Sequence, residues 1–132
     1  MKFMIMVKAT TTSEAGRMPE GFEKIFDEMG RYHDELAKAG ALLDMAGLQP
    51  SSKGWRIRYE GGDQRRVIDG PFTETKELIA GYTLIEVRSR EEALEWTKRF
   101  PRPFDEGTTC EIEVRQLYSP QDVQKLLEES AK

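Results

Sequence analysis

A rigid turn between two strand-like runs, in the stretch from Val67 to Val87, constrains the fold of this chain more than any other part of the sequence. The first run ends at Asp69, and Gly70 and Pro71 follow it. Glycine adopts φ > 0 without steric cost and proline fixes its own φ, so the pair forces the backbone to turn. Asp69 is therefore expected at a defined strand end, either as an ordinary turn-forming residue or as a carboxylate placed for catalysis.

The N-terminal third of the chain predicts a strand followed by a helix. Residues 2–10 form a short apolar run that suits a central strand buried on both faces, and the polar residues 11–18 predict a loop. Between residues 19 and 39, apolar side chains recur at intervals of three and four, which is typical of an amphipathic helix. Pro19 suits the first turn of this helix, and Gly40 suits the position just past its end.

A β-hairpin is predicted next, from residues 55–59 and a returning strand at 65–69. With a three-residue loop, Trp55 faces Asp69 and the carboxylate lies on the apolar face, whereas a two- or four-residue loop moves it to the other face. The hairpin is basic, which indicates either a charged edge facing solvent or a partner subunit, or a rim that attracts an anionic ligand. Its basic residues are Lys53, Arg56, Arg58, Arg65 and Arg66.

The C-terminal half predicts a second strand–helix–strand unit. A strand at 81–87 precedes a helix capped by Ser89 and Glu92, and residues 109–117 alternate as a one-sided strand. Cys110 points inward in that pattern, as a core residue rather than a nucleophile. A short helix follows Ser119. Two such halves with an antiparallel sheet predict an α+β, ferredoxin-like fold with its helices on one face.

Composition narrows the class of protein. The chain has 132 residues, which fits a single domain over residues 1–132, and its 20 basic and 24 acidic residues give a net charge of −4. This balance argues against nonspecific nucleic-acid binding. One cysteine, no long apolar run and no dinucleotide-binding glycine pattern predict a cytoplasmic protein without disulfides, membrane spans or a nucleotide cofactor. One histidine and one cysteine also leave a transition-metal site without support, so no metal is expected.

The turn stretch resembles a known family. Asp69-Gly70-Pro71-Phe72, the following residues 73–77 and Gly81-Tyr82 are similar to the signature of the DGPF (DGPFAETKE) proteins, a branch of the YCII-related family. The resemblance implies a ferredoxin-like domain of the dimeric α/β-barrel superfamily that forms a homodimer and has no agreed substrate. In the wider YCII group it implies an acid/base site made by a histidine and an aspartate.

His33 is the candidate partner of Asp69 in such a site. It lies on the inner stripe of the helix predicted over residues 19–39, where it is either a half-buried histidine bonded to a backbone carbonyl or a catalytic group. Phe72, Tyr82 and Arg58 are the candidate substrate-binding residues. The expected function is a cofactor-independent lyase or isomerase that uses His33 and Asp69 on a small, anionic or aromatic molecule. The alternative is a non-catalytic small-molecule-binding or regulatory dimer.

Overall fold

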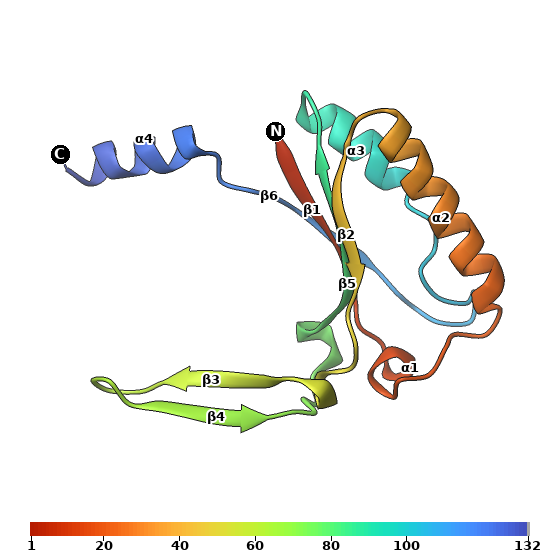
Figure 1. Cartoon of the computed structure of the whole chain (residues 1–132), viewed down its shortest axis with the longest axis horizontal. Coiled ribbons are helices and arrows are strands. Elements are labelled where there is room, and N and C mark those ends of the chain that lie inside the picture. Colours follow the sequence, from red (N-terminus) through yellow and green to blue (C-terminus); the bar gives the residue numbers. More distant parts are fainter. Residues whose placement is uncertain (132) are drawn as a thin grey trace.

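The computed structural model describes residues 1–131. Four antiparallel strands form the main sheet in the order β2-β5-β1-β6, and α2 and α3 cover one of its faces (Figure 1). This mixed α+β arrangement is compatible with the predicted ferredoxin-like fold, and β1 is a central strand as expected. The strands are β1 (Lys2–Lys8), β2 (Leu42–Gly47), β5 (Ile79–Glu86) and β6 (Ile112–Gln116), and the two helices are α2 (Phe22–Lys38) and α3 (Arg90–Lys98).

The hydrophobic core lies between this sheet and the two helices. In β1 the alternate residues Phe3, Ile5 and Val7 are buried, whereas the residues between them are partly exposed. The prediction that β1 is buried on both faces was therefore wrong for the single chain, because no element of the described residues 1–131 covers the second face (Figure 1). The Tyr32 hydroxyl joins the helices by donating to the Trp96 carbonyl oxygen at 2.6 Å.

The helix boundaries follow local capping chemistry. Gly40 follows α2 with φ = 73°, a left-handed conformation that favours glycine, as predicted for the end of this helix. The Ser89 hydroxyl accepts a hydrogen bond from the Glu92 N–H at 3.1 Å and caps α3. The Glu92 carboxylate accepts from the Arg88 N–H, not from the Ser89 N–H, so only half of the predicted capping box forms.

Three sequence-based boundaries were wrong. Helix α2 begins at Phe22, after Gly21 with φ = 71°, so Pro19 precedes the helix and is not in its first turn. Thr11–Glu14 form the short helix α1 inside the predicted loop, because the Thr10 and Ser13 side chains accept hydrogen bonds from each other's backbone N–H groups. At the other end, β6 begins at Ile112, so Cys110 precedes the strand and is partly exposed. The Arg102 guanidinium bonds to carbonyl oxygens as far as Thr108 and holds the preceding backbone in a loop.

The hairpin forms a separate two-stranded sheet of β3 (Trp55–Tyr59) and β4 (Arg65–Asp69). Trp55 pairs with Asp69, which confirms the register predicted for a three-residue loop. The hairpin and the C-terminal helix α4 (Pro120–Ser130) both project from the side of the sheet that carries no helices (Figure 1). Short 3-10 turns, η1 (Ser51–Lys53) and η2 (Thr75–Glu77), connect the hairpin to the main sheet.

Gly70 is required for a reason different from the one predicted. It does not have a positive φ, and the Gly70–Pro71 peptide bond is cis. A Cβ atom at this position would lie 1.9 Å from the Ser51 carbonyl oxygen, so only glycine permits this close approach to η1. Ser51 also links the turn to α1, because its hydroxyl accepts from the Phe72 N–H at 2.9 Å and donates to the Glu14 carboxylate.

Candidate functional site

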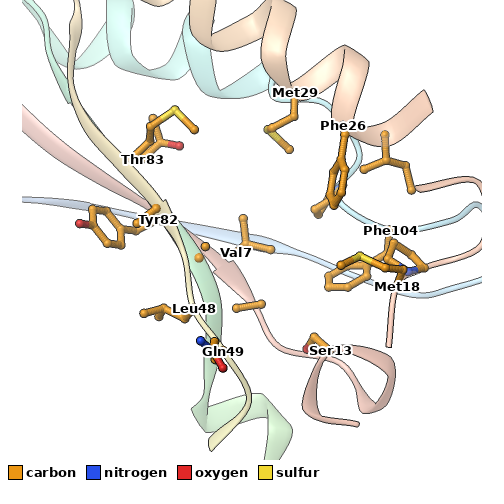
Figure 2. A pocket seen from close by; sticks show the side chains of 18 of the residues that line it. Val7, Ser13, Met18, Phe26, Met29, Leu48, Gln49, Tyr82, Thr83 and Phe104 are labelled. Carbon is orange, nitrogen blue, oxygen red and sulfur yellow. The ribbon is translucent and has the colours of Figure 1, made fainter. Parts of the chain in front are cut away.

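A cavity of about 660 Å³ lies between the N-terminal half of α2 and the edge of the sheet formed by β2 and β5. Figure 2 shows Phe26 and Met29 extending from α2 toward the sheet, with Phe104 and Met18 beside them. Residues from α1 and from the segment that follows β2 complete the wall. Most of the lining side chains are apolar, and they come from segments that are far apart in the sequence.

His33 and Thr83 of β5 are joined by a hydrogen bond in the cavity wall, which also contains the polar side chains of Ser13, Arg17 and Gln49. The His33 Nδ1 atom lies 2.8 Å from the Met29 carbonyl oxygen, and Nε2 lies 2.8 Å from the Thr83 hydroxyl. Because a carbonyl oxygen only accepts hydrogen bonds, Nδ1 carries the proton, and the Thr83 hydroxyl donates to Nε2. Two hydrogen bonds therefore fix both the ring orientation and the neutral tautomer of His33.

Burial determines the charge of His33. Removal from water lowers the pKa of the imidazole below 6.5, while the Met29 carbonyl and the Asp34 carboxylate oppose this effect more weakly. The imidazole is accordingly neutral at pH 7. Its Nε2 lone pair is the only basic position on the ring, and this position already accepts the Thr83 proton.

Gly30 lies in the interior of α2 and lines the same cavity. A Cβ atom at this position would meet no other atom within 4 Å, so packing inside the chain does not require glycine. Glycine in a helix interior costs about 1 kcal/mol relative to alanine. The missing side chain enlarges the cavity next to His33.

The structure separates the five residues that the sequence singled out. His33 and Tyr82 line the cavity, whereas Asp69, Phe72 and Arg58 are not among its lining residues. Asp69 is exposed at the end of β4, Phe72 lies 3.7 Å beneath the Arg56 guanidinium, and Arg58 is exposed in β3. The hydrogen bonds of the His33 ring go to Met29 and Thr83, and the Asp69 carboxylate contributes to neither.

Tyr82 points to the sheet face without helices, because it alternates in β5 with the buried residues Gly81 and Thr83. Its ring points away from the group formed by Phe26 and Met29 (Figure 2), and its hydroxyl donates to the Asp44 Oδ2 atom at 2.9 Å. This hydrogen bond, with the charge of the Asp44 carboxylate, raises the pKa of Tyr82. The part of Tyr82 that borders the cavity is therefore mainly the part closest to the backbone of β5.

Sequence reasoning missed Thr83, Gly30 and the apolar wall. Thr83 occupies an inward position of the predicted strand 81–87, where a buried hydroxyl requires a partner, and Gly30 interrupts the apolar stripe of a predicted helix. Both signals were present in the sequence. Within residues 1–131, no helix is long and apolar enough to cross a membrane, and no three His, Cys, Asp or Glu side chains are grouped to hold a metal ion.

Comparison with known proteins assigns the chain to a family. Residues 1–118 match the YCII-related domain. The chain belongs to the YCII-related family. A relative from Rhizobium meliloti (strain 1021), the uncharacterized protein R00369, is 30% identical over 98 residues, which are 74% of this chain and 78% of that protein. The YCII-related match covers every element that lines the cavity and ends before α4.

Proposed function

We propose that this YCII-related protein binds a mostly apolar small molecule in the cavity between α2 and the sheet. The observation that carries the proposal is the combination of a large apolar wall with one fixed polar pair, His33 and Thr83. Small-molecule sites are typically concave, mostly apolar and about 300–1,000 Å³ in volume, with a few polar groups that orient the ligand. The Thr83 hydroxyl donates to His33 and keeps lone pairs free to accept a hydrogen bond from a ligand.

Gly30 supports this proposal independently. Glycine destabilises the helix at this position, and no neighbouring atom is close enough to exclude a larger side chain. The presence of glycine is explained if a ligand approaches the helix backbone at Gly30. The mouth of the cavity supports it further, because Phe26 and Met18 leave 54% and 60% of their surfaces exposed to solvent. Exposed large apolar side chains that cluster around a cavity mark binding sites.

Two substitutions at Gly30 test the proposal. Gly30→Ala adds one methyl group and leaves most of the cavity open, whereas Gly30→Trp fills it, and both replace glycine in a helix interior. We expect compounds from a metabolite library to raise the melting temperature of the parent and the alanine variant, but not that of the tryptophan variant. Equal stabilisation of all three proteins would contradict binding in this cavity.

Acid/base catalysis without a cofactor is the second candidate function, and the fixed tautomer of His33 favours it. A bound molecule that displaces the Thr83 hydroxyl would meet a basic Nε2 atom whose opposite nitrogen is held by Met29. The Asp69 carboxylate lies outside the cavity of its own chain, so a His33–Asp69 pair is proposed only for the assembled protein. Deuterium uptake from D₂O into a bound compound that is lost in His33→Asn would support lyase or isomerase chemistry. If no deuterium is taken up, small-molecule binding remains as the proposed function and catalysis is contradicted.

We also infer that the protein is a cytoplasmic member of the DGPF branch and forms a homodimer, as the motif at residues 69–77 implies. Met4, Met6 and Leu84 support the homodimer, because they lie on the sheet face without helices and are partly exposed. A second subunit covering this face would produce the dimeric α/β barrel that the resemblance implies. We further propose that residues 1–132 form a single domain and that this domain functions without a cofactor.

A further inference from the structure

The side chains that line the cavity carry a net positive charge. Of the lining side chains described within residues 1–131, only Arg17 carries a full charge at neutral pH, and no aspartate or glutamate lines the cavity. His33 is neutral for the reasons given above, and the Tyr82 hydroxyl keeps its proton. The whole chain has a net charge of −4. The lining of the cavity is therefore positively charged, whereas the protein as a whole is negatively charged.

The position of Arg17 is fixed by the backbone. Its N–H donates to the Thr12 carbonyl oxygen at 3.2 Å, and Gly16 before it has φ = 72°, so the chain turns sharply out of α1 at the cavity. The Arg17 side chain is exposed, and none of the ion pairs found within residues 1–131 involves it. Its guanidinium is thus available to an anion that enters the cavity.

Apolar side chains surround this cation. Met18 follows it directly in the sequence, and Phe26 and Leu48 also line the cavity while remaining largely exposed. A guanidinium beside an apolar mouth fits a molecule with an apolar body and one anionic group at its end. One arginine balances one negative charge, so a carboxylate fits better than a phosphate monoester, whose charge is about −1.5 to −2 at pH 7.

We infer that the ligand of this cavity is a monocarboxylate with an apolar body, whose carboxylate pairs with Arg17 while the body lies against the wall formed by α2. The inference rests on the proposed small-molecule binding and names the class of ligand. Guanidinium groups bind carboxylates through two parallel hydrogen bonds, which orient the ligand as well as attract it.

The test compares 2-naphthoate with the neutral, nearly isosteric 2-naphthamide by isothermal titration calorimetry. We expect the parent protein to bind the carboxylate at least about fivefold more tightly than the amide, and Arg17→Gln to remove this preference without weakening amide binding. Arg90→Gln, an exposed arginine at the start of α3 outside the cavity, is the matched control and should keep the preference. About 1 M NaCl should reduce the preference, because it screens an exposed ion pair.

Each outcome is decisive. Equal affinity of the parent for both compounds, or a carboxylate preference that persists in Arg17→Gln, would overturn the inference while leaving small-molecule binding intact. Binding of neither compound at millimolar concentration would contradict the inference and count against the proposed function as well. Arg17 is exposed and makes no ion pair with any residue between 1 and 131, so the melting temperature of Arg17→Gln should stay close to that of the parent, which separates a binding effect from unfolding.

Discussion

At the scale of single residues, His33 shows how burial and hydrogen bonding select one protonation state. The ring is 7% exposed, and both nitrogens have partners, so the neutral form needs no water. A proton added to Nε2 would remove the acceptor of the Thr83 hydroxyl and place a positive charge in a mostly apolar wall. The environment that orients His33 therefore also keeps it uncharged.

The stability of the protein should depend on the protonation of His33. Its pKa is lowered in the folded state, so between that value and about 6.5 the unfolded chain binds more protons. The free energy of unfolding should then be highest above pH 6.5 and fall as the pH drops below it. An NMR titration of the single histidine, with urea unfolding at several pH values, measures both effects. A His33 pKa at or above 6.5 would contradict this account.

At the scale of elements, the turn after β4 is held by contact with η1. The Ser51 hydroxyl and carbonyl group meet the turn at Phe72 and Gly70, and the Ser51 backbone N–H donates to Glu14 of α1 at 2.9 Å. Three segments that are distant in the sequence thus meet at one serine. This contact connects the hairpin to the part of the chain that carries Arg17.

Replacing Gly70 tests this contact. Gly70→Ala places a methyl group 1.9 Å from a backbone oxygen, so the turn must shift, at a cost on the order of 1–3 kcal/mol in the free energy of unfolding. Gly61→Ala in the hairpin loop is the control, because a Cβ atom there meets nothing within 4 Å. Chemical denaturation should show a loss in the first variant only. Equal midpoints for both would show that the Gly70 contact is not tight.

The elements were predictable from the sequence because their signals are local. The apolar stripe of α2, the Ser89 cap and the hairpin register with Trp55 opposite Asp69 each depend on residues close together in the chain. The cavity depends on α1, α2, β5 and the loop after α3 meeting in space, and no local pattern encodes that meeting. Arg17 therefore gained its significance only from the structure, whereas the inward position of Thr83 was a local signal in the sequence.

At the scale of the whole molecule, apolar side chains remain exposed on the side without helices. Trp55, Tyr59 and Val67 of the hairpin are 64%, 68% and 62% exposed, and Leu127 of α4 is 63% exposed. The hairpin and α4 project from the same side as the open sheet face (Figure 1). One partner seated on that face would cover the sheet and reach both projections, which is why we expect an assembly with a second copy.

The homodimer can be tested by one substitution on the open face. Leu84→Arg places a charge in the middle of β5 on that face, and Leu94→Arg places the same charge on exposed α3 as the control. We expect sedimentation to show a dimer for the parent and for Leu94→Arg at micromolar concentration, and a monomer for Leu84→Arg. A monomeric parent protein at that concentration would contradict the proposed assembly.

The claim that the cavity binds a small molecule is tested most directly by NMR of methyl-labelled methionines. The chain has six methionines: Met18, Met29 and Met45 line the cavity, whereas Met1, Met4 and Met6 do not. Addition of the compound that most raises the melting temperature should shift the first three methyl signals and leave the other three unchanged. Shifts confined to Met4 and Met6, on the open sheet face, would contradict the account and place the ligand outside the cavity.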